Sequence, residues 1–364
     1  MEPIEILGLT CAEFSQLAKE RIPRGHGFAK AVYKRALQTG RVELGESPAS
    51  EQTRAAYARE VTCTLPKVVR THREDGPRGT TAKAVFASAD GLEYECVYLP
   101  MGRGRSTLCI SSQVGCKMGC TFCETGRMGL IRQLTATEIV GQVLAARLDL
   151  GLEFRNIVFM GMGEALDNAP AVIQALRVLT DSAGLSICQE HITVCTVGHV
   201  AGLGQLHQAG FKRLNLSVSL NATTDEQRSQ MMPVNRRTPL LALQQALADY
   251  RPRHNFALGV NYCLLPGIND HPDDAARMAA FCAPLGRVMI NVIPYNPGTT
   301  PVAKAPTEAE IATFIERVRA HGLPVRRRIT KGRSVMAACG QLGNVDLRGQ
   351  IRSERRRLQQ LPSD

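Results

Sequence analysis

After about residue 105 the chain alternates short strand-like runs with helical stretches, and this alternation limits the possible folds more than any other feature. The runs are rich in β-branched residues and read "STLCISS", "RNIVFMGMG", "HITVCTVG", "RLNLSVSLNA", "FALGVNYCLLPG", "RVMINVIPYNPG" and "LPVRRRIT". Between the first two, Thr135 and Glu138 form a capping box before an amphipathic stretch. Alternating β and α segments predict a parallel sheet, and six or more in succession indicate a full or partial barrel. We therefore expect an α/β fold with a partial (β/α)6-type barrel.

The part of the chain before the barrel shows two other patterns. The apolar spacing in "CAEFSQLAKERI" and "FAKAVYKRAL" predicts helices there. In "TAKAVFASADGLEYECVYLP", two alternating runs are joined by Asp90-Gly91, which predicts a β-hairpin. We divide the chain into a small helical accessory domain, a hairpin with linker, the barrel and a basic tail, which span residues 1–60, 61–104, 105–345 and 346–364.

Residues with unusual chemistry stand at the ends of the predicted strands. They are the cysteine-rich segment 109–123, Gly161-Met162-Gly163-Glu164, Ser219-Leu220-Asn221 and Asn296. In parallel barrels the carboxyl ends of the strands meet at one face, and that face carries the chemistry. The fold and the motifs therefore predict a single site.

Composition narrows the class of protein. The chain has 364 residues, of which 44% are apolar and 21% charged, so most of it is expected to be globular. No apolar run approaches twenty residues, and the start lacks the pattern of a secretory signal. We expect a cytoplasmic protein without membrane contact. Thiols stay reduced in that compartment, so twelve cysteines are not a disulfide framework, and the scattered ones are expected to be buried apolar side chains.

The net charge of +11 favours a polyanionic partner. The excess is concentrated in "RIPRGHGFAKAVYKRALQTGR", "VRRRITKGR" and "LRGQIRSERRRLQQ". Each run taken alone is equally compatible with a solvated face, but three in one chain favour nucleic acid. Aromatic residues are only 5% and tryptophan is absent, so a stacking platform for single strands is not evident.

Four cysteines are crowded into fifteen positions of "LCISSQVGCKMGCTFCETG". Cys116, Cys120 and Cys123 are spaced C-x3-C-x2-C, and Cys109 stands seven residues upstream. A closed structural zinc site takes four ligands, so a local one would need Cys109. Iron–sulfur clusters are normally closed by four thiolates, so three cysteines on a four-iron cube leave one iron open. The spacing is the radical S-adenosylmethionine (SAM) signature, in which the open iron holds SAM.

Several longer stretches resemble one family. "ECVYLP", "TLCISSQVGCKMGCTFC", "GMGEALDN", "SLNATTDEQRSQMMPVN", "INVIPYNPG" and "AACGQL" occur in this order. Together they closely resemble the RlmN/Cfr family of radical-SAM adenine methyltransferases. The resemblance covers about two thirds of the chain, and the first sixty residues look only loosely like the family's RNA-binding domain. It implies a radical-SAM barrel whose three spaced cysteines bind a [4Fe-4S] cluster, with SAM as the second cofactor.

The resemblance also implies roles for two further cysteines. Cys339 of "AACGQL" would take a methyl group from one SAM, and a radical from a second SAM would remove a hydrogen from it. The methylene radical would add to an adenine carbon, C2 in preference to C8, and Glu95 would accept the ring proton. Attack by Cys109 on the Cys339 sulfur would free the RNA and leave a transient disulfide. The plainer alternatives are that the two cysteines are packed core thiols and that Glu95 forms an exposed pair with Glu93.

Other positions match the family's SAM contacts. These are Gly163 and Glu164 for the ammonium group, Ser219, Leu220 and Asn221 at one strand end, Asn296 of "PYNP", and Cys195 where a serine is common. The family usually has histidine at Asn221 and proline at Ala165. "KGRSVMAACGQL" also lacks the acidic residues common before the methyl-carrying cysteine.

The leading hypothesis is an RNA methyltransferase acting on 23S ribosomal RNA, with tRNA as a further candidate. It would need an electron donor and a disulfide reductant, both unidentified, and we expect a monomer. The altered loop before Cys339 motivates a second hypothesis, a radical-SAM offshoot with another RNA target or carbon. The third is a non-catalytic iron–sulfur protein that binds RNA and senses redox state.

Overall fold

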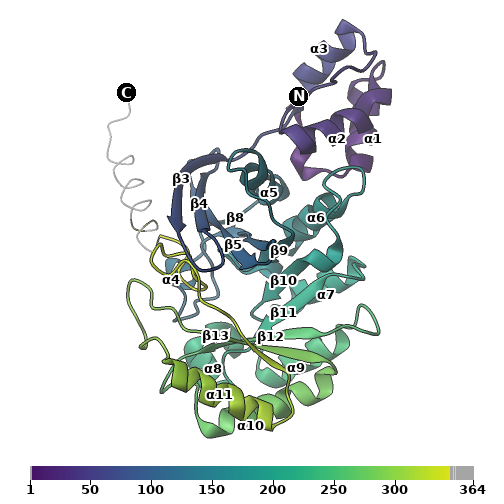
Figure 1. Cartoon of the computed structure of the whole chain (residues 1–364). Helices are drawn as coiled ribbons and strands as arrows, with labels where there is room; N and C mark the ends of the chain where they lie inside the picture. Colours follow the sequence, from purple (N-terminus) through teal and green to yellow (C-terminus); the bar gives the residue numbers. More distant parts are fainter. Residues whose placement is uncertain (1, 345–346, 348, 350–364) are drawn as a thin grey trace, which may run out of the picture.

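The structure of the chain is a computed structural model that describes residues 2–344, 347 and 349 (Figure 1). Its main feature is an open, curved ten-stranded sheet in the order β14-β13-β12-β11-β10-β9-β6-β5-β4-β3. The strands from β14 to β6 are parallel neighbours, and β5, β4 and β3 continue the sheet in antiparallel pairs. The strands are β3 (Lys67–Glu74), β4 (Thr81–Ala87), β5 (Glu93–Gly102), β6 (Arg105–Cys109), β9 (Asn156–Phe159), β10 (Ile192–Thr196), β11 (Asn215–Ser219), β12 (Leu258–Leu264), β13 (Val288–Pro294) and β14 (Val325–Arg327).

All seven runs predicted as strands are present, as β6 and β9 to β14, and the partial barrel is confirmed. The sheet stays open because β14 and β3 form its two edges. Ile157, Val158 and Phe159 are buried in succession, without alternation. This is the pattern expected of a parallel strand that is covered on both faces.

The helices that follow the strands pack side by side along the outside of the sheet (Figure 1). Thr135 begins the first of them as predicted, since its hydroxyl accepts the Glu138 N–H at 3.2 Å while the Glu138 carboxylate accepts the Thr135 N–H at 2.8 Å. Each fully buried leucine or valine on their inner faces contributes about 1.5–3 kcal/mol. The helices are α5 (Ala136–Leu148), α6 (Ala169–Thr180), α7 (Val200–Gln208), α8 (Asp225–Met231), α9 (Leu240–Asp249), α10 (Pro272–Cys282) and α11 (Glu308–Ala320).

The N-terminal residues form a separate helical lobe beside α5 and α6 (Figure 1). It contains α1 (Cys11–Arg21), α2 (Ala29–Thr39), α3 (Glu51–Glu60) and a parallel pair of short strands, β1 (Ile4–Glu5) and β2 (Val61–Thr62). The Cys11 N–H donates to the Asp181 carboxylate at 2.7 Å, which ties the start of α1 to the end of α6. The basic tail predicted at 346–364 lies outside the described residues apart from Leu347 and Gly349. None of the helices in the described part of the chain is long and apolar enough to cross a bilayer.

The predicted hairpin is formed by β4 and β5, which pair antiparallel. Its turn is held because the Arg132 guanidinium bonds the Asp90 carboxylate at 2.5 and 3.1 Å. The hairpin is an extension of the main sheet, since β5 also pairs with β6 and places Val97 opposite Cys109. Residues on the hairpin can therefore reach the interior of the barrel.

A small two-stranded sheet closes the loop that carries the three spaced cysteines. Strand β7 (Gln113–Val114) pairs antiparallel with β8 (Arg132–Gln133), and the Cys116 N–H donates to the Gly129 carbonyl at 3.1 Å. The short helix α4 (Glu124–Met128) lies within this loop. Gly115 has a φ of +78°, and a Cβ there would lie 1.8 Å from the Gly129 oxygen. Only glycine fits at this position.

We expect Gly115→Ala to destabilise the chain more than Gly104→Ala does. Both glycines have positive φ, at +78° and +67°, so an alanine at either site costs about 1–2 kcal/mol. Gly104 has no atom within 4 Å of the added Cβ, whereas Gly115 meets the Gly129 carbonyl. The clash at Gly115 should destabilise that variant by about 1–3 kcal/mol more. Urea unfolding of both variants measures the difference, and equal losses would contradict the close approach.

Candidate active site

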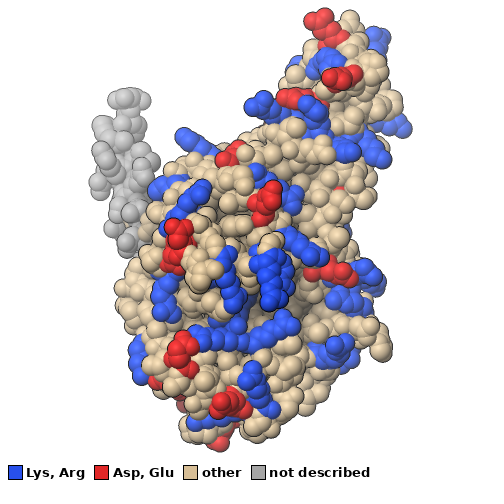
Figure 2. Space-filling model, in the orientation of Figure 1, with Lys and Arg blue, Asp and Glu red and all other residues tan. Residues whose placement is uncertain are grey.

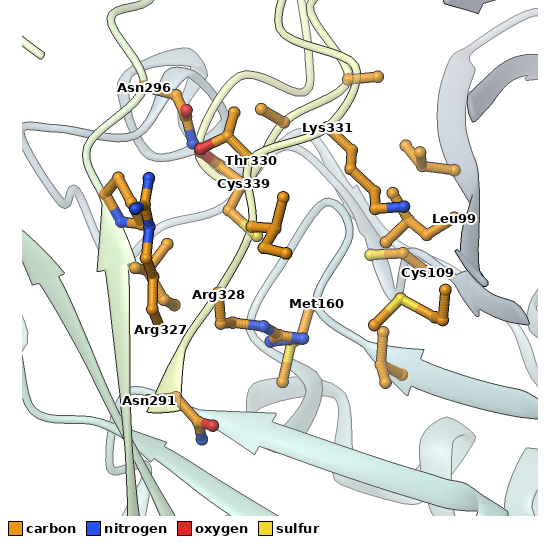
Figure 3. Close-up of a pocket in the computed structure, with 18 of the residues that line it drawn as sticks. Leu99, Cys109, Met160, Asn291, Asn296, Arg327, Arg328, Thr330, Lys331 and Cys339 are labelled. Atoms are coloured by element: carbon orange, nitrogen blue, oxygen red, sulfur yellow. The ribbon is translucent and has the colours of Figure 1, made fainter. Parts of the chain in front are cut away.

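Two adjoining cavities lie inside the curve of the sheet. The larger has a volume of about 380 Å³ and the smaller of about 160 Å³. Met160, Ile293 and Cys339 line both cavities. Figure 3 shows the larger cavity, with Cys339 on the loop after β14 and Cys109 near the end of β6. The predicted convergence of strand ends on one site is therefore seen in the structure.

The three spaced cysteines lie together beside the smaller cavity. Cys120 and Cys123 line it, and Cys116 is buried in the same cluster of side chains. Burial raises the pKa of Cys120 well above its ordinary value, and the charges of Cys123 and Cys116 raise it further. Only a deprotonated sulfur binds metal. Three thiolates in this buried place would therefore need a bound, positively charged group to stabilise them.

Three thiols are too few to close a zinc site, which takes four ligands, and they suffice for a cluster with one open iron. Among the described residues, no group of three or more His, Cys, Asp and Glu side chains is placed to hold a metal ion. A zinc ion draws every thiolate to about 2.3 Å from one centre, whereas a cluster spreads its thiolates over several irons. Cys116, Cys120 and Cys123 could hold three irons and leave a fourth open.

Cys109 lies in the larger cavity, apart from the other three cysteines. Burial raises its pKa, the charge of Cys339 raises it further, and the Arg328 guanidinium opposes this shift. The alternative of a zinc site that includes Cys109 finds no support in this geometry. Two cations stand near Cys339 in the sequence: the Lys331 ammonium donates to the Pro100 carbonyl, and the Arg333 guanidinium donates to the Asn296 amide oxygen.

The loop between β7 and β8, which carries Cys116, Cys120 and Cys123, is called the cluster loop here. Cys339 lies against it although more than two hundred residues separate the two in sequence. The Glu124 N–H, next to Cys123, donates to the carbonyl of Gly340 at 2.8 Å. The Thr125 hydroxyl donates to the Leu342 carbonyl at 2.6 Å. The Cys339 side chain is exposed and lines both cavities, so it can reach ligands in either.

Gly163 and Glu164, predicted to contact SAM, line the smaller cavity. Gly163 has a φ of +104°, and a Cβ there would lie 2.6 Å from the Gln113 side chain. The buried Glu164 carboxylate accepts the Val197 N–H at 2.8 Å and the Leu166 N–H at 3.1 Å. Burial raises its pKa to about 7, which these hydrogen bonds oppose. A cation beside it would favour the ionised form.

Three more predicted SAM contacts line the same cavity: Cys195, Ser219 and Asn221. The Asn261 amide donates to the Cys195 sulfur at 3.2 Å, and the Ser219 oxygen lies 3.6 Å from that sulfur. Asn221 has a φ of +59°, and its side-chain oxygen accepts the Cys263 N–H at 2.8 Å. Leu220 is fully buried and is absent from the lining of both cavities.

Asn296 lines only the larger cavity. Its amide nitrogen donates to the Cys339 carbonyl at 3.2 Å, and its oxygen accepts the Arg333 guanidinium at 3.0 Å. Both ends of its side chain are thus engaged within the protein. In this structure Asn296 holds the loop that carries Cys339.

Glu95 lines neither cavity. Its carboxylate pairs with the Lys83 ammonium at 3.3 Å and accepts the Gly343 N–H at 3.1 Å. Lys83 in turn donates to the Met336 carbonyl at 3.3 Å. The ion pair therefore ties the hairpin to the two ends of the segment that includes Cys339. Glu93 points to a different partner, the Arg70 guanidinium, so the two glutamates do not form an exposed pair.

Sequence reasoning missed several polar groups around the cavities. The guanidinium of Arg228 is fully buried and donates to the carbonyls of Val197 at 2.6 Å and Leu220 at 3.0 Å. Arg328 belongs to the basic run "VRRRITKGR", which was expected to face nucleic acid or solvent, and its guanidinium points into the larger cavity (Figure 3). Cys263, expected as a buried apolar side chain, lines the smaller cavity, and Cys188, expected to be buried, is exposed. Their charge or sulfur was visible in the sequence, but their environment depends on distant segments.

Comparisons with known proteins agree with this geometry. Residues 110–279 match the model of the radical SAM superfamily. The chain is 39% identical to a probable dual-specificity RNA methyltransferase RlmN 1 of Protochlamydia amoebophila, over 95% of this chain and 96% of that one. It is 35% identical to the dual-specificity RNA methyltransferase RlmN of Syntrophobacter fumaroxidans, over 94% and 98%. A crystal structure of a radical SAM methyltransferase from Sphaerobacter thermophilus is similar with a TM-score of 0.83 and 34% identity, over 93% and 99%.

Anaerobic reconstitution of the full chain with iron and sulfide is expected to give about four irons per chain. Cys120→Ala should lose most of this iron, because one of three thiolates is removed. Cys109→Ala should keep it, because Cys109 lies in the other cavity. Iron and sulfide analysis measures the content. Equal iron loss in both variants would instead indicate a site with four thiolates.

Proposed function

Because the chain belongs to the RlmN/Cfr family of radical SAM RNA methyltransferases, we propose that it methylates a ring carbon of adenine in RNA through Cys339 and Cys109. The coarser part of this statement, a SAM-dependent radical methyltransferase, follows from the family. The observation that carries the finer part is the contact between the two cysteine segments. Hydrogen bonds from Glu124 and Thr125 to Gly340 and Leu342 bring Cys339 beside the cluster loop.

The cofactors of the family fit the smaller cavity. Cys116, Cys120 and Cys123 would hold a [4Fe-4S] cluster, which when bound supplies the electron that converts SAM to a radical. Gly163 and Glu164 offer a carbonyl and a carboxylate to the SAM ammonium group. Cys195, Ser219 and Asn221 line the wall around them. For Leu220 we propose a backbone or packing role, since it is buried behind this wall.

Cys339 is the residue that can serve both cavities. Its thiolate would accept a methyl group from SAM at the smaller cavity and present it to adenine in the larger one. A radical from a second SAM would first remove one hydrogen atom from this methyl group, and the resulting carbon would add to adenine. The adduct would then lose the ring proton and pass one electron back to the cluster, after which the Cys109 sulfur would attack the Cys339 sulfur. The carbon–sulfur bond would break with its electron pair on carbon, which takes a proton to become the methyl group. The two sulfurs would be left as a disulfide, so an external dithiol reductant is needed for each turnover.

The proposal extends to which RNA is the substrate and which adenine carbon is methylated. We propose 23S ribosomal RNA as the substrate, with tRNA as a second one, and C2 of adenine in preference to C8. The relatives described above are named dual-specificity RNA methyltransferases, which supports more than one RNA substrate. The altered loop supports a second candidate, an offshoot acting on another RNA. In it Arg333 and Ser334 bond Asn296 and Glu74, in place of the acidic residues common there.

The test is methyl transfer from labelled SAM to ribosomal and transfer RNA, followed by nucleoside mass spectrometry. We expect label in 2-methyladenosine with the wild-type chain and none with Cys339→Ala, because the methyl carrier is lost. Cys109→Ala should accumulate a covalent complex of RNA and protein, because the attack on the Cys339 sulfur cannot occur.

Cys188→Ala is the matched control, since Cys188 is exposed and lines neither cavity. It should methylate RNA like the wild-type chain. Transfer at full rate without Cys339 would overturn the thiol mechanism. Label in 8-methyladenosine, or only in another RNA, would favour the second candidate. Failure of the reduced, reconstituted chain to cleave SAM would favour the non-catalytic redox sensor.

The role of Glu95 as proton acceptor stays a prediction, and its contacts support a positioning role. The Lys83–Glu95 ion pair is largely buried, with 9% and 13% of the two side chains exposed. Each partner also bonds the loop that carries Cys339. Breaking such a pair leaves a buried charge uncompensated, which typically costs about 3–5 kcal/mol.

We expect Glu95→Gln and Lys83→Met to lower the methylation of Cys339 to a similar extent, because both release the loop. Mass spectrometry of the chain after incubation with SAM measures S-methylcysteine directly. A proton acceptor would behave differently, since its loss acts after RNA has become attached. Full methylation of Cys339 together with a trapped RNA complex in Glu95→Gln alone would therefore contradict the positioning role.

A further inference from the structure

A third hollow lies beside the larger cavity and is lined by arginines. Its volume is about 510 Å³, and it is formed by the turns that follow β3 and β5. Arg78 lines both this groove and the larger cavity, so the two adjoin at this side chain. The other arginines of the groove are Arg73, Arg103 and Arg105, and its single acidic lining residue is Glu153. We call this hollow the arginine groove.

The charge of the arginine groove is not compensated. Its four arginines are exposed, and none has an ion pair or a side-chain hydrogen bond within the described part of the chain. Other arginines of the same region are paired, as Arg70 is with Glu93 and Arg132 with Asp90. Four exposed arginines that line one groove without a carboxylate partner favour binding of an anion there.

The positive surface continues into the larger cavity. Lys331 lines that cavity, and burial together with the charge of Arg78 lowers its pKa. Farther in, the Arg328 guanidinium has no carboxylate partner among the described residues, and its one hydrogen bond there is to the Met160 sulfur at 3.2 Å. Figure 2 shows lysine and arginine side chains gathered around a hollow on this face. An anionic chain would therefore meet positive side chains both in the groove and in the cavity that Cys109 and Cys339 line.

The rim of the larger cavity also offers apolar surface. Met101 is 41% exposed and Ile329 51% exposed, and both line the cavity. These two side chains add apolar surface to a rim that is otherwise rich in positive charge. Apolar contact for bases next to guanidinium groups for phosphates is the combination that a single-stranded nucleic acid needs.

We propose that the arginine groove binds the ribose-phosphate backbone of the RNA next to the target adenine, and that the strand enters the larger cavity at Arg78. This inference rests on the proposed function and adds the path of the substrate. Contacts to phosphate carry no sequence information, so the groove positions the RNA while the larger cavity selects the base. A single flexible strand follows such a path more readily than a duplex.

The test compares Arg103→Gln/Arg105→Gln with the matched control Arg287→Gln/Arg319→Gln in the reconstituted full chain. All four arginines are exposed, and both variants lose two positive charges. Arg287 precedes β13 and Arg319 lies on α11, away from the cavities. Binding of a single-stranded RNA fragment with the target adenine is measured against salt concentration. Equal melting temperatures would show that both variants are folded.

We expect the groove variant to bind RNA roughly tenfold more weakly and the control to bind like the wild-type chain. The plot of log K against log salt concentration should become shallower by about 1.4 in the groove variant, which corresponds to two lost phosphate contacts on a single strand. Its KM for RNA should rise while kcat and SAM cleavage without RNA stay unchanged. Arg103→Lys/Arg105→Lys should restore the slope, because charge rather than shape is needed.

The same slope and affinity in the groove variant and the control would overturn the inference. This outcome is distinct from failure of the proposed function, because binding is measured without turnover. Wild-type chain that binds RNA through the groove but transfers no methyl group would contradict the proposed function alone. Normal methyl transfer by the wild-type chain, together with unchanged RNA binding in the groove variant, would contradict only the proposed role of the groove. Loss of slope without rescue by lysine would also contradict it, since a structural role would then explain the loss.

Discussion

The site depends on one set of hydrogen bonds between segments that are far apart in the sequence. The N–H of Glu124 and the hydroxyl of Thr125 bond the carbonyls of Gly340 and Leu342. These bonds close the C-terminal loop over the cluster loop and place Cys339 where the two cavities meet. Without these bonds, nothing in this pair of segments would hold Cys339 next to the loop that carries Cys116, Cys120 and Cys123. The loop is also tied from the hairpin side through Glu74, Lys83 and Glu95, so the extension of the sheet positions the same cysteine.

The two thiols of the proposed mechanism have different surroundings, and the difference suits the order of their use. Cys339 is exposed on a loop, whereas Cys109 is buried at the end of a strand. Burial raises the pKa of Cys109, and the charge of Cys339 raises it further, which favours the protonated thiol. The Arg328 guanidinium opposes that shift. A nucleophile needed only after RNA has become attached gains from such restraint, because early attack would serve no purpose.

Local patterns predicted the framework of the molecule, and they failed where the outcome depended on distant partners. The seven strand runs, the capping box at Thr135 and the turn at Asp90 are signals within a few residues. Glu164 was found because strand ends converge in a barrel. The SAM contact at Asn296 stays a prediction, and its hydrogen bonds to Arg333 and the Cys339 carbonyl could not be predicted from the motif. Arginine is usually expected at the surface. The buried Arg228 guanidinium bonds the Leu220 and Val197 carbonyls, and these come together only because β10 and β11 are neighbours in the sheet.

The unusual composition of the loop before Cys339 changes its charge without releasing it. Ser334 bonds the Glu74 carboxylate through its N–H at 2.8 Å and also through its hydroxyl. Arg333 holds Asn296, which in turn holds the carbonyl of Cys339. A neutral and a basic residue thus anchor the loop to acceptors on β3 and just after β13. The loop borders the cavity proposed for RNA, so the positive charge of Arg333 and the lack of acidic residues in 331–342 leave no carboxylate of this loop to repel phosphate. The hydrogen bonds that position Cys339 and the charge that would attract the proposed substrate therefore come from the same short segment.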